Sequence, residues 1–230
     1  MSRQIISFSR IAGIGAAGFA AAIVLGNVIL APAGLPVTGS EIGEVQAFFS
    51  AKGDLVGVAS LLGPATWVLA TLFGAGAVAA LWRSERERGE AWSLAGFAGL
   101  LLQNTTFTGV MATRLALTST AGHDGSATTG LWALHDALFG LNGTFLALAL
   151  VGLSVSGLRS GLIRRWHATL GLAAAALQFT SATLTSVIMD EAGPLGLIGL
   201  AGWLMWVVWL GAWGLALIRL APAPRVQPAG

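Results

Sequence analysis

Long apolar runs separated by short polar turns organise this sequence. The runs cover residues 11–30, 54–82, 92–117, 131–157, 167–189 and 195–218. A helix of about 20 apolar residues spans a hydrocarbon core about 30 Å thick, so each run is long enough to cross a membrane. We therefore predict an all-α integral membrane protein with six transmembrane helices, a single domain over residues 1–219 and a disordered tail over residues 220–230.

The polar connections carry local signals of their own. In the longest connection, Ser40 can cap a helix, and Glu44 falls in its first turns ahead of Phe48. We expect a short helix there, lying in the membrane interface. Pro64 inside the second run predicts a kink. The turn RSERERGE, residues 83–90, reads as a solvated charged turn.

The placement of basic residues gives an orientation. Hydrophobic residues make up 55% of the chain and charged residues 10%. It has 12 Lys and Arg residues and 10 Asp and Glu residues, which gives a net charge of +2. With six spans, ten basic residues fall on one side: Arg3, Arg10, Arg83, Arg86, Arg88, Arg159, Arg164, Arg165, Arg219 and Arg225. Basic loops stay in the cytoplasm, so we expect both termini there, in a multi-pass protein of a bacterial inner membrane. Arginines scattered in short loops do not form a nucleic-acid surface, so we expect no nucleic-acid partner.

Ionisable residues gather near the opposite, outer side. Arg114 lies near the outer end of the third span, and His135 and Asp136 lie near the outer end of the fourth. An arginine inside a membrane needs a partner, for which Asp136 is the first candidate and Asp54 the second. Two interpretations stay open: an ion pair that locks two helices, or a site that opens outward for a small polar or anionic ligand, a lipid headgroup or a proton.

Amide side chains mark a second level, near the middle of the membrane. Gln103 and Asn104 lie about 17 Å from the inner end of the third span, and Asn142 and Gln178 reach a similar depth on the next two. Gln103 and Arg114 are separated by about 20° on a helical wheel and therefore share a face. These amides either hold helices together or line a cavity or pathway.

Four tryptophans form an arc on the sixth span. Trp203, Trp206, Trp209 and Trp213 fall within about 120° of one another, and two of them lie far from the interfaces where tryptophan is usually enriched. The arc indicates helix packing or lipid contact, or alternatively a surface for a flat apolar ligand or a partner subunit.

Several kinds of chemistry find no support. The string from Gly13 to Gly18 matches GxGxxG but lies within a span, where close helix packing explains it better than a dinucleotide. There is no cysteine and no Gly-x-Ser-x-Gly motif, and His135 and His167 lie at opposite sides of the membrane, too far apart to hold one haem. We expect no catalytic residue, no metal and no cofactor, with bound lipid as a candidate. A metal site from His135, Asp136 and Asp54 stays open as an alternative.

Two stretches carry a family resemblance. EVQAFFSAKGDL, residues 44–55, and FGLNGTFLALALVGLSVSGLRSGLIRRWHATLGL, residues 139–172, resemble uncharacterised bacterial six-span membrane proteins of the domain-of-unknown-function type. The resemblance implies the six-span architecture and no activity.

The functional expectation rests on the two polar levels. We expect a protein that binds or transports a small polar molecule, ion or lipid through an outward-facing polar pocket, built from Arg114, His135, Asp136, Asp54, Gln103, Asn104, Asn142 and Gln178. One alternative is a non-catalytic accessory subunit that docks its Trp-rich sixth helix in a homo- or hetero-oligomer. A second is a metal-dependent membrane hydrolase.

Overall fold

The computed structural model describes residues 6–190 and 192–220, and these residues form helices without strands. In chain order the helices are α1 (Phe8–Leu30), α2 (Ile42–Ser60), α3 (Gly63–Arg88), α4 (Trp92–Thr120), α5 (Gly125–Arg159), α6 (Arg165–Thr183), α7 (Thr185–Asp190) and α8 (Gly196–Arg219). The all-α prediction is confirmed. The predicted disordered tail lies outside the described residues apart from Leu220, as do Arg3 and Arg225.

Four helical segments are long and apolar enough to cross a membrane. They are Phe8–Leu30, Ile42–Arg88, Gly125–Arg159 and Gly196–Arg219. α4 and α6 are not among them, because polar residues such as Gln103, Arg114 and Gln178 interrupt their apolar sequence.

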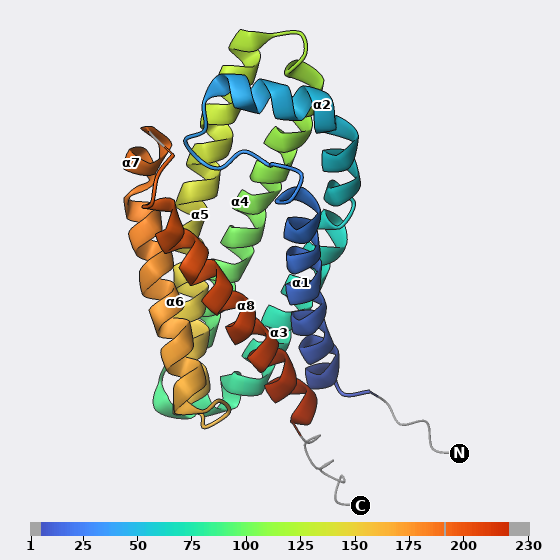
Figure 1. Ribbon diagram of the computed structural model, residues 1–230. Coiled ribbons are helices and arrows are strands. Elements are labelled where there is room, and N and C mark those ends of the chain that lie inside the picture. Colours follow the sequence, from blue (N-terminus) through green and yellow to red (C-terminus); the bar gives the residue numbers. More distant parts are fainter. Residues whose placement is uncertain (1–5, 191, 221–230) are drawn as a thin grey trace, which may run out of the picture.

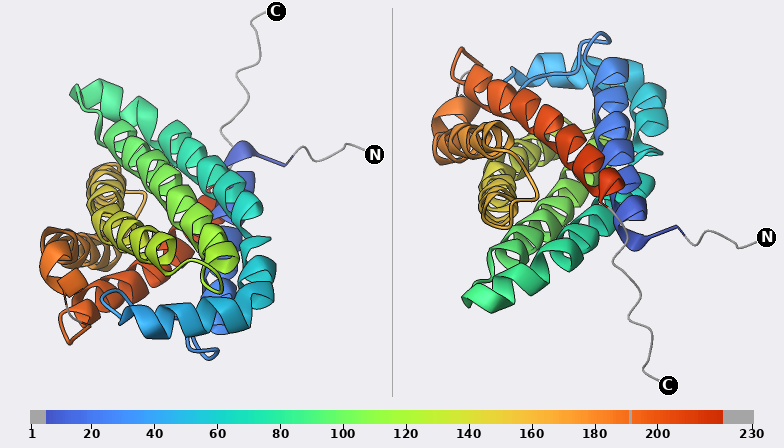
Figure 2. Two further views of the ribbon diagram at one scale, coloured as in Figure 1. Left: turned by 90° about the horizontal axis from the view of Figure 1, so that it is seen from above. Right: turned by 90° about the horizontal axis from the view of Figure 1, so that it is seen from below.

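The helices form one elongated bundle. α1, α3, α4, α5 and α6 run along its length, and α8 crosses it diagonally (Figure 1). α4 and α5 form the longest hairpin, and the first half of α2 lies across one end of the bundle, which we call the α2 end (Figures 1 and 2). The start of α1 and the end of α8 meet at the opposite end.

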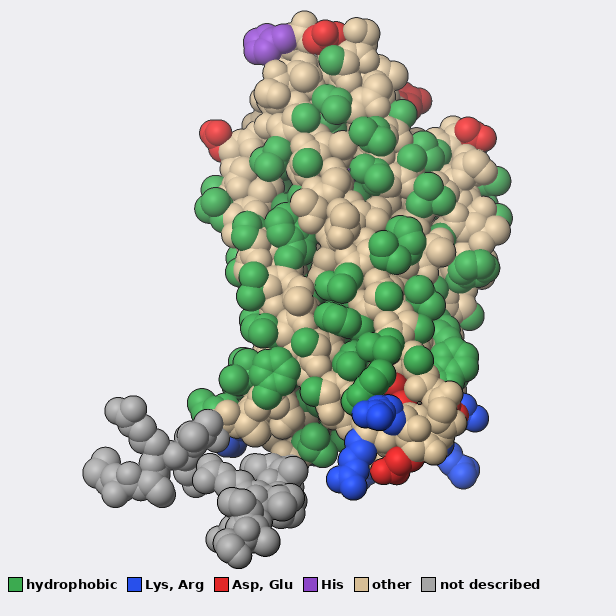
Figure 3. All heavy atoms as spheres, turned by 180° about the vertical axis from the view of Figure 1, so that it is seen from behind, with side chains coloured by type: hydrophobic (Ala, Val, Ile, Leu, Met, Phe, Trp, Pro, Cys, Tyr) green, Lys and Arg blue, Asp and Glu red, His purple; other side chains and the backbone are tan. Residues whose placement is uncertain are grey.

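Side-chain charge differs between the two ends. On the face in Figure 3, Lys and Arg side chains gather at the lower end together with some acidic groups, whereas acidic and histidine side chains mark the α2 end. Hydrophobic side chains cover the surface in between.

The polar connections differ from the sequence prediction in their details. α2 bends at Lys52, where φ is −121° and ψ is 18°, and it ends before α3 begins at Gly63. Pro64 therefore lies in the first turn of α3, where its missing N–H costs no helical hydrogen bond, and does not kink a continuous helix. The residue that precedes α2 is Glu41, so the predicted Ser40 cap is wrong.

Two helix ends were also misplaced by the sequence pattern. α5 begins at Gly125, six residues before the predicted start of its apolar run, because the Asp124 carboxylate accepts the backbone N–H groups of Ser126 and Ala127. The predicted span over residues 167–189 is interrupted at Leu184, which separates α6 from α7.

Two apolar cores fill the bundle at different levels. The larger core joins α1, α3, α4, α5, α6 and α8, and includes Phe19, Phe73, Leu150 and Trp209. The smaller core lies under α2 at the α2 end and includes Phe49 and Trp132. Arg114, His135, Asp136 and the amides Gln103, Asn104 and Asn142 lie on the stretches of α4 and α5 between these cores.

Backbone contact between α4 and α5 sets their register. A Cβ atom on Gly99 would lie 2.6 Å from the backbone nitrogen of Ala149 and 2.8 Å from the carbonyl oxygen of Phe145. Only glycine fits such a contact. The approach fixes which residues of the two helices face each other further along.

Candidate functional site

A chain of hydrogen bonds links α4, α5 and the connection before α2. The Arg114 Nε–H group donates to His135 Nε2 at 3.0 Å, His135 Nδ1 lies 3.0 Å from Asp136 Oδ1, and the Gly39 N–H donates to Asp136 Oδ2 at 2.9 Å. Arginine has only donors, so Nε2 of His135 must accept. The hydrogen of the imidazole is therefore on Nδ1 and is donated to Asp136. A neutral imidazole thus joins a cation to a carboxylate.

Local structure explains how these groups meet. α4 and α5 are antiparallel, so the last turns of α4 face the first turns of α5 (Figure 1). Gly39 has φ of +81°, a left-handed conformation that favours glycine, and this turn aims its N–H at Asp136. The connection over residues 31–41 is thereby fastened to α5.

Aromatic rings hold the imidazole of His135 in place. Trp132 is stacked on it with ring centroids 4.6 Å apart and an interplanar angle of 10°. Phe139 lies parallel to it at 6.0 Å, and Phe107 packs against Phe139. His135 is 3% exposed and Asp136 2%, so the inner part of the chain is shielded from solvent.

The arginine itself is less enclosed than its partners. Arg114 is half-buried, and its one hydrogen bond within the described residues uses Nε. Its two amino groups, Nη1 and Nη2, therefore keep four N–H donors for another acceptor. Such a planar pair of donors matches the two oxygens of a carboxylate or phosphate.

The remaining predicted partner lies elsewhere. Asp54 is exposed on α2 and takes part in no ion pair between described residues. Arg114 is thus connected to Asp136 through His135, and not to Asp54. Across residues 6–190 and 192–220, no three His, Asp or Glu side chains come close enough to hold a metal ion, and the set of His135, Asp136 and Asp54 is not assembled.

The predicted amide level exists as a set of buried side chains. Gln103 is 4% exposed, and Asn104, Asn142 and Gln178 are each 7% exposed. Gln178 Nε2 donates to the carbonyl oxygen of Gly199 at 3.0 Å, which ties α6 to α8. Gln178 therefore acts as a helix tie, the first of the two interpretations left open by the sequence.

The tryptophan arc faces the protein interior. Trp206, Trp209 and Trp213 are buried, and Trp203 is half-buried. Trp209 Nε1 donates to Ser154 Oγ at 3.0 Å, and the carbonyl oxygen of Trp209 accepts from His167 Nε2 at 2.9 Å. The arc thus packs α8 against α6 and the core, the first of the interpretations that the sequence left open, while the surface for a partner or apolar ligand stays a prediction.

The sequence pattern missed a buried acid at the opposite end of the bundle. Glu85 is fully buried, and its carboxylate accepts the Ser93 backbone N–H at 2.7 Å and the Ser93 hydroxyl. It thus caps the N-terminus of α4. The predicted solvated turn over residues 83–90 is therefore wrong in two respects, because α3 continues to Arg88 and Glu85 is buried. Glu90 in the same turn accepts from Arg88 at 3.0 Å and from Arg159 at 2.5 Å, which joins the α3–α4 and α5–α6 turns. The sequence offered one indication of this cap: Ser93 lies near the start of the third apolar run, where its N–H and hydroxyl groups need an acceptor.

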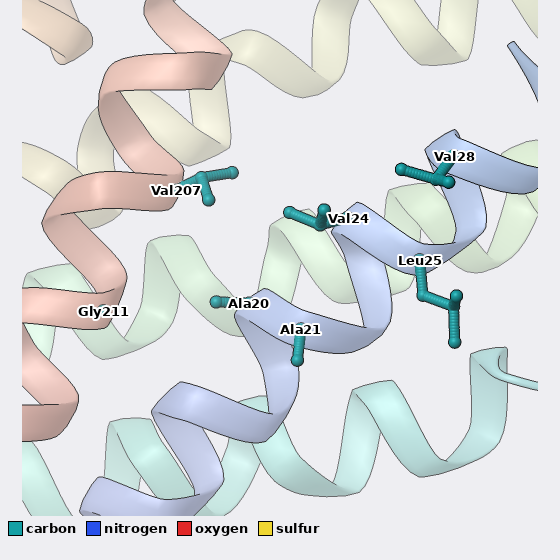
Figure 4. A pocket seen from close by; sticks show the side chains of 7 residues that line it. All are labelled: Ala20, Ala21, Val24, Leu25, Val28, Val207 and Gly211. Atoms are coloured by element: carbon teal, nitrogen blue, oxygen red, sulfur yellow. The ribbon is translucent and has the colours of Figure 1, made fainter.

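Two hollows on the surface lie away from Arg114. One is an apolar groove of about 510 Å³ between α1 and α8, lined by Ala20, Ala21, Val24, Leu25, Val28, Val207 and Gly211 (Figure 4). The other, about 370 Å³, lies beside Trp82, Arg83, Arg86 and Glu87 at the end of α3. Neither hollow is lined by residues of the predicted outward-facing polar pocket.

Comparisons of the chain with protein-family models, with curated proteins and with solved structures found no match.

Proposed function

We propose that this chain is a six-span integral membrane protein that binds a small anionic group, a carboxylate or a phosphate, through Arg114 at the extracytoplasmic end of α4 and α5. The observation that carries the proposal is the hydrogen-bonding of Arg114. Its Nε is held by a neutral histidine, and both amino groups remain available.

The six-span part rests on how the less apolar helices are placed. α4, with 29 residues, and α6, with 19, lie alongside α5, which is apolar enough to cross a membrane (Figure 1). Their amide side chains point into the bundle: Gln103, Asn104 and Gln178 are all buried. Helices that hide polar groups in this way can cross a bilayer beside apolar neighbours.

The orientation rests on the unequal ends of the bundle. Basic residues flank the turns between α3 and α4 and between α5 and α6: Arg83, Arg86 and Arg88 lie in the last turns of α3, Arg159 ends α5, and Arg164 precedes α6. Basic turns of this length remain cytoplasmic. The α2 end, with Arg114, then faces the extracytoplasmic side.

The electrostatics of the site favour a weakly held anion. Asp136 balances the arginine charge only through the intervening imidazole, and direct contact between the carboxylate and the guanidinium is replaced by two hydrogen bonds in series. Because the one hydrogen bond of Arg114 within the described residues uses Nε, an incoming anion does not need to displace a partner of Nη1 or Nη2.

Anion-dependent stability tests the site. The purified protein would be melted in detergent with phosphate, acetate or chloride at equal ionic strength. A ligand at about 100 times its dissociation constant stabilises the folded state by about 2.7 kcal/mol. We expect phosphate or acetate to raise the melting temperature of the wild type above that in chloride, and not that of Arg114→Gln. The control Arg83→Gln, altered at an exposed position, should respond like the wild type. An equal response of Arg114→Gln would contradict the proposal.

Labelling in intact cells tests the orientation. The chain has no cysteine, so single cysteines can be introduced at Val37, which is 64% exposed in the connection before α2, and at the exposed Glu87. A membrane-impermeant maleimide should modify Val37→Cys in intact cells and Glu87→Cys only after permeabilisation. The reverse pattern would place Arg114 on the cytoplasmic side.

A further inference from the structure

Three buried side-chain atoms near the middle of α4 and α5 have no hydrogen-bond partner within the described residues. They are Gln103 Oε1, Asn104 Nδ2 and Asn142 Oδ1. Each of the three side chains is more than nine-tenths buried. Buried amide atoms nearly always have a hydrogen-bond partner, either a protein group or an ordered water molecule. We therefore expect a partner for these three atoms.

The register of α4 against α5 places these residues at one level. Gly99 contacts Phe145 and Ala149, and Gly109 faces Leu138, where a Cβ atom would lie 3.2 Å from Leu138 Cδ1. Between these two contacts the antiparallel helices bring residues 103 and 104 opposite residues 142–144. The three unpaired atoms therefore belong to one polar layer.

A third helix closes this layer. A Cβ atom on Gly143 would lie 2.7 Å from the carbonyl oxygen of Gln178 and 3.3 Å from Gln178 Oε1. Gln178 on α6 thus packs against Gly143, the residue that follows Asn142 on α5, while its own amide nitrogen donates to Gly199. The layer lies between the two apolar cores, enclosed by helices.

The unpaired atoms define the chemistry of an occupant. Gln103 Oε1 and Asn142 Oδ1 accept hydrogen bonds, whereas Asn104 Nδ2 donates. A metal cation would satisfy the two oxygens but face the N–H of Asn104, and an anion would face two carbonyl oxygens. A hydroxyl group, above all that of water, both donates and accepts. Water has two hydrogens for the two oxygens and a lone pair for the N–H.

We propose that the layer formed by Gln103, Asn104 and Asn142 binds a hydroxyl group, supplied by a buried water molecule or by a small polyol. This site is about 16 Å from Arg114 along α4. Its occupancy does not depend on anion binding at Arg114.

Asparagine-selective isotope labelling gives a direct test. The chain contains three asparagines, Asn27, Asn104 and Asn142, so [15N]Asn protein in lipid gives three side-chain amide signals, which the variant Asn27→Gln reduces to two. Magnetisation transfer to the Asn104 amide protons would be measured from water, and from the C–H protons of glycerol when glycerol is added. Transfer from water identifies a bound water, and transfer from glycerol identifies a polyol. Absence of transfer from both would overturn the proposal.

The direction in which Asn142→Leu changes the melting temperature distinguishes a filled site from an empty one. If a hydroxyl bridges the layer, Asn142→Leu removes one of its acceptors and should lower the melting temperature more than Asn27→Leu, which alters an exposed asparagine on α1. If the atoms have no occupant, Asn142→Leu removes an unpaired buried oxygen and should raise the melting temperature. A raised melting temperature would therefore overturn the proposal.

Discussion

Asp136 holds the candidate site together, and replacing it by asparagine tests that role. The carboxylate accepts two hydrogen bonds, from His135 Nδ1 and from the Gly39 N–H, through different oxygens. Asparagine has one acceptor oxygen, so its NH₂ group would face one of the two donors. The side chain is 2% exposed, and water cannot replace the missing acceptor.

The magnitude follows from these contacts. A hydrogen bond to a charged group contributes about 1.5 to 3 kcal/mol, and a buried donor left unpaired costs a similar amount. We expect Asp136→Asn to lower the free energy of unfolding by about 2 to 3 kcal/mol through the lost bond.

Reversible unfolding in mixed detergent micelles, followed by tryptophan fluorescence, measures this loss. The matched control is Asp54→Asn, an exposed carboxylate on α2 whose replacement should change the free energy of unfolding by less than about 0.5 kcal/mol. Equal stabilities of Asp136→Asn and Asp54→Asn would refute the hydrogen-bonded chain.

Three further substitutions test the packing and the helix caps. Gly99→Ala should lower the free energy of unfolding by about 1 to 3 kcal/mol in the same assay, because the added Cβ would lie 2.6 Å from a backbone atom of α5. The control Gly130→Ala should not destabilise the protein, because its Cβ would meet no atom within 4 Å. Glu85→Leu should cost about 1 to 3 kcal/mol by leaving the Ser93 N–H unpaired, and Glu85→Gln should recover most of it. Hydrogen bonds from the Ala127 N–H, the Ser126 hydroxyl and the Ser126 N–H lower the pKa of Asp124. Its carboxylate therefore contributes fully to the stability of the folded state above the ordinary aspartate pKa, and this contribution is lost as pH falls through the lowered pKa. Melting curves from pH 7 to pH 2 should show Asp124→Ala less stable at neutral pH and the difference vanishing in acid.

The apolar pattern was sufficient to place both ends of three helices. The first, third and sixth predicted spans agree with α1, α4 and α8 to within three residues at each end. Helix ends set by individual hydrogen bonds were less predictable. The start of α5 depends on the Asp124 cap within a polar stretch. The break at Leu184 falls among Thr, Ser and apolar residues that carry no glycine or proline to mark it.

The sequence predicted which side chains lie close together where this depends only on their position along a helix. Arg114, His135 and Asp136 were expected to meet because all three lie near the same helix ends, and they do. The participation of Gly39 was not predictable, since it depends on the path of a long connection. The tryptophan arc shows the limit of a helical wheel: it places four rings on one face, but whether that face is buried depends on the diagonal path of α8.

Accessibility of position 114 from outside the cell shows whether Arg114 faces the extracytoplasmic side. In the cysteine-free chain, Arg114→Cys would be exposed in intact cells to a membrane-impermeant, negatively charged thiosulfonate, with the buried position Asp136→Cys as the control. We expect modification of Arg114→Cys from the outside at a rate well above that of Asp136→Cys. Modification only after permeabilisation, or at neither position, would contradict an anion site on the extracytoplasmic face.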